Sequence, residues 1–222
     1  MFACEGVTCQ DSYTDDCGER YLLCVTCLEG YTGFPYGGYM NFPWVGGRRC
    51  LDFVGTLKHR GTPEEQELLT DPRMLSNWAV EGRLLDSGIV VTDDDFVAAI
   101  ALRDAIYRTV VARLEDRRPK VADVELLNQQ ASQPQLARRL RRNGSIRREG
   151  TAPQLLASLA ADLVDLFAGP DIQNVKCCGY PHCILFYVDA SRAKNRHWCG
   201  MRICGNRAKV EGFRARQRAA AT

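Results

Sequence analysis

Four cysteines near the end of the chain form two closely spaced pairs. Four residues separate Cys178 from Cys183 and Cys199 from Cys204, and fifteen residues lie between the pairs. Two such pairs can converge on one zinc ion, because Zn²⁺ favours a tetrahedral set of thiolate ligands. Four thiolates close the coordination sphere and leave no position for water or substrate. The spacing therefore predicts one structural zinc site and not a catalytic one.

Other metal-binding side chains lie next to these four cysteines. Cys177 could replace Cys178, but only Cys178 keeps the two pairs equally spaced. We interpret His182 and His197 as surface residues or residues that face phosphate. The four cysteines alone are therefore the predicted ligands.

The segment between the two pairs predicts a small core for this zinc domain. Ile184, Phe186 and Val188 alternate as in a short strand, and their apolar face is expected to cover the metal. Trp198 is interpreted as a core residue and not as a platform for a nucleic-acid base, because so small a domain has little other core.

The final segment predicts a basic helix from about Met201 to Arg218. At 100° per residue, Cys204 points toward the metal and a stripe of mainly basic residues points away from it. This stripe contains Arg202, Asn206, Lys209, Phe213 and Arg216. Its cations suit DNA phosphates, and an amide can read an adenine edge. Alternatively, Asn206 and Arg207 brace the zinc loop through backbone carbonyls. The candidate DNA-binding residues are thus Arg202, Asn206, Arg207, Lys209 and Arg216.

Charge is unevenly distributed along the chain, although the formal net charge is only +2. Residues 1–137 carry 13 Lys or Arg and 21 Asp or Glu, whereas residues 171–222 carry ten and three. Such segregation suggests a C-terminal part that binds a polyanion, and a solvated basic tail is the alternative.

Composition and length narrow the class of protein. The 222 residues include 45% hydrophobic and 25% charged residues, as in an ordinary folded cytosolic protein. No apolar run reaches the roughly 18 residues that a membrane span needs. The acidic first residues do not resemble a signal peptide. We therefore expect a cytoplasmic protein without membrane contact, in which cysteines bind metal or remain free.

Five further cysteines lie in residues 1–41, a turn-rich extension with little helical periodicity. Cys4 and Cys9 form one pair and Cys24 and Cys27 another, so their spacing permits a second zinc site, with Cys17 left over. Mobile thiols, or a redox or metal sensor, are the alternatives.

The middle of the chain, residues 42–170, has mainly helical patterns. Helices are predicted from Pro72 to about Gly88, from Asp93 to Arg117, from Val121 to Ala131 and from the Thr151 cap to Ala168. Asn143-Gly144 between Arg-rich arms predicts a β-hairpin. Gly169-Pro170 marks the boundary with the last domain, residues 171–222.

The C-terminal residues resemble the CGNR zinc-finger family. The resemblance rests on Cys199-x4-Cys204-Gly205-Asn206-Arg207 and on Cys178-x4-Cys183 upstream. Residues 42–170 resemble the ABATE domain that precedes this finger, through Gly46-Gly47 and Leu51-Asp52-Phe53-Val54-x-Thr56. Gly55 stands where that family usually has Asn. The fold class expected is α+β and mostly α-helical: a helical ABATE-like domain with a small hairpin, then a treble-clef-like zinc domain that ends in a basic helix.

The resemblance implies a bacterial, stress-linked transcription regulator that binds Zn²⁺ and DNA. The ABATE-like domain would sense a small-molecule ligand or form a homodimer. The competing interpretations are a biosynthetic or ligand-processing enzyme with the finger as a scaffold, and a protein-interaction adaptor. Residues 42–170 contain no G-x-S-x-G, Walker or H-E-x-x-H motif, which favours a protein that is not an enzyme.

Overall fold

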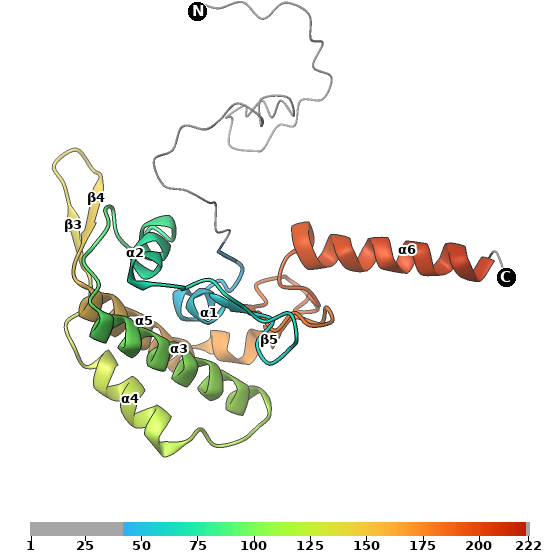
Figure 1. Ribbon diagram of the computed structural model, residues 1–222, viewed down its shortest axis with the longest axis horizontal. Helices are drawn as coiled ribbons and strands as arrows, with labels where there is room; N and C mark the ends of the chain where they lie inside the picture. The colour runs from blue at the N-terminus through green and yellow to red at the C-terminus, as the bar shows by residue number, and fades with distance from the viewer. Residues whose placement is uncertain (1–41, 221–222) are drawn as a thin grey trace, which may run out of the picture. The chain divides into compact units, whose positions relative to one another are not determined.

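Helices α1 and α3 to α5 form the core of the middle part of the chain (Figure 1). The computed structural model describes residues 42–220. Its helices here are α1 (Arg49–Val54), α2 (Pro72–Glu81), α3 (Asp93–Leu114), α4 (Val121–Ala131) and α5 (Ala152–Ala168). Helix α4 packs on α3 and α5, and α1 packs on the same two helices. Fully buried side chains such as Trp78, Leu102 and Leu155 fill the space between them.

Local capping signals set the starts of the two longest helices. Thr92 and Asp95 form a reciprocal capping box at α3, and Thr151 and Gln154 form another at α5. The predicted helices 121–131 and 152–168 are confirmed. Two predicted ends were too late: α2 ends at Glu81, where Gly82 caps it, and α3 ends at Leu114.

Three two-stranded antiparallel sheets complete the described part of the chain. They pair β1 (Leu57–Lys58) with β2 (Gln66–Glu67), β3 (Ala137–Leu140) with β4 (Ile146–Glu149), and β5 (Val175–Cys177) with β6 (Phe186–Val188). The β3–β4 hairpin confirms the turn predicted at Asn143-Gly144, and Gly144 has the positive φ that this turn requires. The predicted α+β, mostly helical fold class is confirmed.

The C-terminal part begins with a 3₁₀ turn, η2 (Pro170–Asn174), and ends in helix α6 (Asn206–Ala220). A π-helical turn, η3 (Met201–Gly205), precedes α6, and its Gly205 N–H donates to the Gly200 carbonyl at 3.0 Å. The predicted last helix therefore starts with a wider turn than an α-helix has. Among residues 42–220, no helix has both the length and the apolar character needed to cross a membrane.

In the middle part of the chain, residues of the ABATE-like motif take part in hydrogen bonds and close packing within the fold. Arg103 is buried and donates to both carboxylate oxygens of Glu67, at 2.7 and 2.6 Å, and to Thr56 Oγ1 at 3.1 Å. Asp52 Oδ1 accepts from the Gly46 N–H at 2.8 Å. A Cβ atom at Gly55 would lie 3.1 Å from the side chains of Leu185 and Pro43. Gly55 thus permits a close approach by the C-terminal part, where a larger residue would crowd Leu185.

Candidate metal centre

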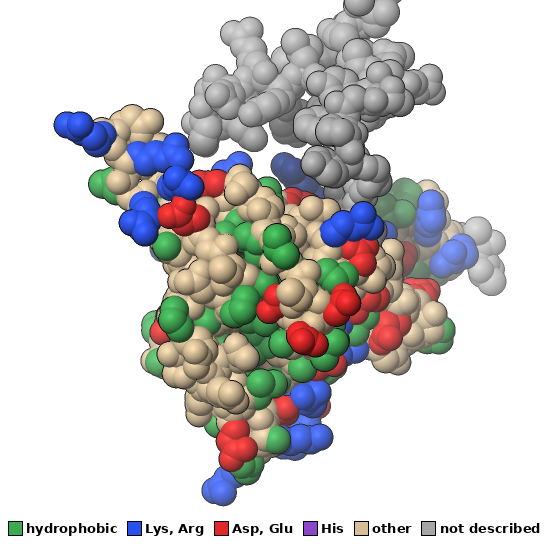
Figure 2. Space-filling model, turned by 60° about the vertical axis from the view of Figure 1, so that its left-hand side comes forward, with side chains coloured by type: hydrophobic (Ala, Val, Ile, Leu, Met, Phe, Trp, Pro, Cys, Tyr) green, Lys and Arg blue, Asp and Glu red, His purple; other side chains and the backbone are tan. Residues whose placement is uncertain are grey.

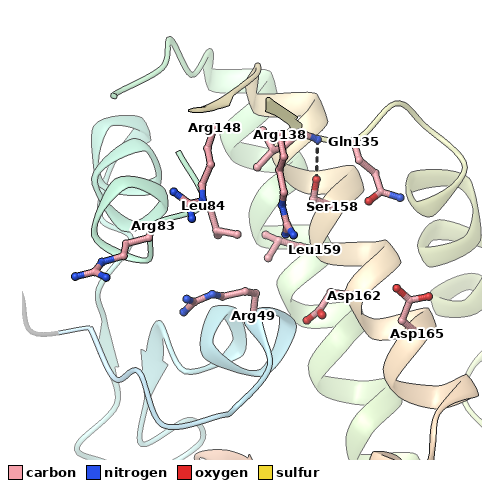
Figure 3. Close-up of a pocket in the computed structure, with 11 residues that line it drawn as sticks. Arg49, Arg83, Leu84, Gln135, Arg138, Arg148, Ser158, Leu159, Asp162 and Asp165 are labelled. Carbon is pink, nitrogen blue, oxygen red and sulfur yellow. Dashed lines mark hydrogen bonds between the residues drawn. The ribbon is translucent and has the colours of Figure 1, made fainter. Parts of the chain in front are cut away.

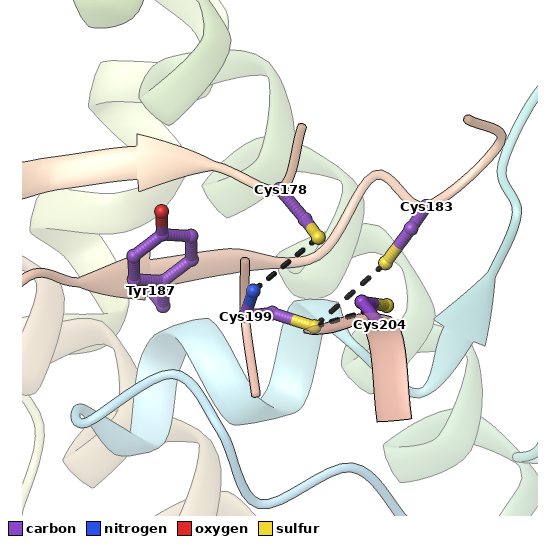
Figure 4. Close-up of a cluster of buried hydrophobic side chains, with 5 residues drawn as sticks. All are labelled: Cys178, Cys183, Tyr187, Cys199 and Cys204. Carbon is purple, nitrogen blue, oxygen red and sulfur yellow. Dashed lines mark hydrogen bonds between the residues drawn. The ribbon is translucent and has the colours of Figure 1, made fainter. Parts of the chain in front are cut away.

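The sulfurs of Cys178, Cys183, Cys199 and Cys204 converge on one point (Figure 4). All four lie within 4.8 Å of one another, and all four residues are buried. Cys199 Sγ lies 3.9 Å from Cys183 Sγ and 3.6 Å from Cys204 Sγ. Zinc–sulfur bonds of about 2.3 Å in a tetrahedron place sulfurs about 3.8 Å apart. The separations fit a zinc ion bound by four thiolates, and they are far too long for disulfides.

Different structural elements hold the two halves of this cluster. Cys178 follows β5 directly, and its N–H donates to the Leu185 carbonyl across the loop to β6. Cys199 precedes η3 and Cys204 lies within it. The Cys199 N–H donates to Cys178 Sγ at 3.3 Å, which joins the two halves. The cluster therefore connects the hairpin to the beginning of α6.

The thiols compete for negative charge at this site. Hydrogen bonds from Cys183 and Cys199 lower the pKa of Cys178. Hydrogen bonding to Cys178 raises the pKa of Cys183 to about 12, and burial raises the pKa of Cys204. Four thiolates can coexist here only with a cation between them, since a coordinated metal deprotonates its thiol ligands.

Tyr187 covers the sulfur cluster, contrary to the prediction for this strand. The Tyr187 side chain is fully buried against the four cysteines, with Val45, Leu185 and Trp198 beside it. Phe186 points to the other side of β6 and stacks on Tyr107 of α3. The expectation that Ile184, Phe186 and Val188 cover the metal was wrong, because β6 packs between the cysteines and the helices.

Asp189 is the centre of a hydrogen-bond network that the sequence analysis did not identify. Its buried carboxylate accepts from Lys176 Nζ at 2.7 Å, from the Ser191 hydroxyl at 2.6 Å and from the Arg196 N–H at 2.9 Å. Burial opposes ionisation, but these donors together hold the pKa of Asp189 well below its ordinary value. The network fixes the loop that leads to Cys199.

Arg196 and Tyr187 complete the support of that loop. The Arg196 guanidinium donates to the carbonyls of Trp198 and Cys199 and lies 4.4 Å from the centre of the Tyr187 ring. In return, the Tyr187 hydroxyl donates to the Arg196 carbonyl at 2.7 Å. Donors around a thiolate site orient its ligands. Arg196 precedes the ligand Cys199 by three residues, within the loop that this network fixes.

The remaining candidate ligands lie outside the cluster. Cys177 is exposed, and so are His182 and His197. The His182 carbonyl lies 2.7 Å from His59 Nδ1, so His59 of the middle part contacts the zinc loop. The other candidate ligands, Cys4, Cys9, Cys24 and Cys27, lie outside the described residues.

Helix α6 and the preceding turn η3 present the candidate DNA-binding side chains to solvent. Arg202, Asn206, Arg207, Lys209 and Arg216 are all exposed. Among residues 42–220, no hydrogen bond joins the Asn206 or Arg207 side chain to the zinc loop. The helix contacts that loop instead through Glu211, which accepts from the Tyr180 hydroxyl at 2.5 Å.

A groove of about 910 Å³ runs along one side of α6. Arg202, Asn206 and Arg207 line it, together with His59 and His182, whereas Lys209 and Arg216 are not among its lining residues. The π-helical turn explains this division, because the α-helical spacing assumed between Arg202 and Lys209 does not hold across η3.

Two family models match consecutive parts of the chain. The ABATE model, described as "Putative stress-induced transcription regulator", matches residues 47–170. The CGNR zinc finger model matches residues 174–217, which include all four clustered cysteines. No curated protein matches this sequence.

Proposed function

The chain belongs to the ABATE family and carries a CGNR zinc finger, and from this premise we propose that it is a zinc-dependent, DNA-binding transcription regulator. One observation carries the proposal: the four-sulfur cluster holds the start of an exposed basic helix. Cys204 lies in η3, immediately before α6. A zinc ion at this cluster would therefore fix where the basic helix points.

The charge of α6 suits a polyanionic partner. Its 15 residues include five arginines or lysines and one acid, Glu211, whose carboxylate is bound by Tyr180. Phosphate contacts supply most of the affinity of proteins for DNA, and counterion release makes that affinity dependent on salt. Contacts by Arg202, Lys209 and Arg216 would position the helix on the backbone. Asn206 would contact a base edge.

The buried polar groups of the middle part support a regulatory role over an enzymatic one. Arg103 donates to Glu67 and Thr56, and Asp52 accepts from the Gly46 N–H. These hydrogen bonds join segments of the fold to one another, which supports a structural role for these groups. We propose that the ABATE domain senses a small-molecule ligand or mediates a homodimer. A cytoplasmic location, with access to bacterial DNA, is part of the same proposal.

Binding of the zinc-loaded protein to mixed-sequence duplex DNA tests this function. Fluorescence anisotropy between about 50 and 200 mM salt should show log Kd rising linearly with log salt concentration. Removing zinc with a chelator should abolish the binding, and restoring zinc should recover it. Sequencing of genomic fragments retained by the protein would then identify its sites. An absence of DNA binding at low salt would refute the proposal.

A further inference from the structure

The β3–β4 hairpin places two pairs of arginines directly opposite each other. Its register aligns Arg138 with Arg148 and Arg139 with Arg147. Like charges at opposed positions destabilise a hairpin unless a counterion lies between them. Because side chains alternate along a strand, the two pairs lie on opposite faces of the hairpin. Figure 2 shows Arg side chains gathered on this hairpin, at the upper left.

One of these faces has its own counterion. Glu149 Oε1 accepts from Arg139 Nε at 2.9 Å, and Glu149 Oε2 lies 2.6 Å from Arg147 Nε. A single carboxylate thus bridges both arginines and relieves their repulsion. This outer face of the hairpin needs no external anion.

The other face lacks an equivalent carboxylate. Within residues 42–220, Arg138 forms no ion pair. The Arg148 guanidinium reaches Asp86 only at 3.5 Å, whereas an Asp86 oxygen accepts from the Arg148 backbone N–H at 2.9 Å. Asp86 is therefore used mainly to anchor the strand. The Arg138–Arg148 pair remains undercompensated.

This undercompensated pair lines a cavity of about 450 Å³ between the hairpin, α1 and α5. Figure 3 shows Arg138 and Arg148 extending from the hairpin toward the cavity, with Arg49 extending from α1 and Arg83 at the edge. The cavity also contains Asp162, but that carboxylate is already bound.

Asp162 does not neutralise the arginines of the cavity. One of its oxygens forms an ion pair with the Arg48 guanidinium at 3.0 Å, and the other accepts from the Cys50 N–H at 2.9 Å. Four arginines therefore line the cavity; Arg49 is paired with Asp52 at 3.3 Å, whereas Arg83 and Arg138 form no ion pair within residues 42–220. In the same part of the chain, Asp165 is the lining carboxylate that forms no ion pair. The cavity carries a local surplus of positive charge.

We propose that this cavity binds a small organic phosphate. Guanidinium groups bind phosphate oxygens in a bidentate manner, and several of them together suit a dianion. The cavity is larger than a phosphate ion requires and lies within the range of small-molecule sites. Its wall includes Leu84, Leu136 and Leu159, which suit an organic body, and Asp165 can accept from a hydroxyl or amine of the ligand.

The inference deepens the proposed sensing role, and its test is independent of DNA binding. The full-length, zinc-loaded protein is titrated by calorimetry at low salt with AMP, ADP, a sugar phosphate and inorganic phosphate. We expect saturable binding of at least one organic phosphate, tighter than that of inorganic phosphate. Arg138→Gln should weaken this binding about tenfold, the loss of one charge-assisted contact.

Arg139→Gln is the matched control, since it removes the same charge from the adjacent position on the opposite face. It should leave organic phosphate binding unchanged, and circular dichroism should show both variants folded. Equal weakening by both variants would overturn the inference, as would binding of no organic phosphate. The inference would also be overturned if duplex DNA displaced the organic phosphate from the unaltered protein and this displacement were lost in Arg138→Gln. The arginines of the cavity would then contact DNA. Organic phosphate binding by a zinc-loaded protein that does not bind DNA at low salt would refute only the regulatory proposal.

Discussion

The Tyr107 ring of α3 stacks on the Phe186 ring of β6, with ring centroids 5.6 Å apart and an interplanar angle of 26°. Arg60 lies over the same Tyr107 ring at 4.4 Å. The contact joins the middle helices to the back of the strand that covers the cysteines. The Val188 N–H adds a hydrogen bond to the Gly46 carbonyl at 2.8 Å. The cysteine hairpin is therefore packed onto the helices.

Disrupting this stacked pair should destabilise the whole described unit. We expect Phe186→Ala to cost about 3–5 kcal/mol in the free energy of unfolding, because Phe186 is buried. A double-mutant cycle with Tyr107→Ala should yield a coupling of about 0.5–1.5 kcal/mol. Urea denaturation measures both quantities, and Phe186→Leu is the control that keeps apolar volume. A coupling near zero would contradict the role of the stack.

Two adjacent cysteines should differ completely in their effect on zinc content. Cys178→Ser removes a buried ligand and should lower zinc retention and unfold residues around the cluster. Cys177→Ser changes an exposed neighbour and should leave zinc content unchanged. Atomic emission on the purified full-length variants measures the metal directly. Loss of zinc from Cys177→Ser, with retention by Cys178→Ser, would reverse the assignment.

The number of zinc ions can be decided by the same measurement. A variant with Ser in place of Cys4, Cys9, Cys24 and Cys27 leaves the clustered sulfurs intact. If residues 1–41 contribute no site, this variant should retain as much zinc as the unaltered protein, about one ion per chain. A fall from two ions to one would establish a second site.

The free energy of unfolding should decrease as the pH rises from about 4 to about 6, because Asp52 loses its proton in this range. Burial raises the pKa of the Asp52 carboxyl from 3.8 to about 6, although the Gly46 N–H and Arg49 oppose the shift. The folded state therefore holds the proton more tightly than the unfolded state. The stability due to protonated Asp52 is present below about pH 4 and is lost as the pH rises through 6, by on the order of 2–3 kcal/mol.

Asp52→Asn should remove this part of the pH dependence, since its side chain can still accept from the Gly46 N–H without a buried charge. Asp94→Asn, at an exposed position in α3, should leave the pH dependence unaltered. Denaturant titrations at several pH values give the free energies of unfolding. If the free energy of unfolding of Asp52→Asn changed with pH between 4 and 6 as steeply as that of the unaltered protein, Asp52 would not titrate in this range.

The exposed side chains of η3 and α6 should affect DNA binding in two distinct ways. Replacing Arg202, Lys209 or Arg216 by Ala should weaken binding to every sequence and lower the salt slope by about one unit. Asn206→Ala should cost about 1–3 kcal/mol at the preferred site and relax sequence choice there. Chelator titrations should show unchanged zinc affinity, because within residues 42–220 the Asn206 side chain forms no hydrogen bond with the zinc loop.

Gln173→Ala is the amide control for Asn206, because Gln173 is exposed but lies in η2, away from α6. It should change neither affinity nor sequence preference. If Asn206→Ala loosened zinc and weakened binding to all sequences equally, Asn206 would support the zinc loop and would not read a base.

The sequence by itself determined the features that local chemistry controls. Thr92 and Thr151 cap helices through residues three positions away, and Asn143-Gly144 specifies a tight turn. These interactions span a few residues and need no distant partner. The spacing of Cys178, Cys183, Cys199 and Cys204 belongs to the same class, since short loops bring each pair together. The fold class and the sulfur cluster could be predicted for that reason.

Only the tertiary structure decided which side of each element faces which partner. Alternation along β6 identified two faces, but Tyr187 faces the sulfurs because Phe186 is packed against Tyr107. Asp189 acquired its central position from donors that lie up to 13 residues away. Arg138 and Arg139 are neighbours of the same type, yet one meets Glu149 and the other a cavity. Such differences arise from long-range packing, which residue type and spacing do not encode locally.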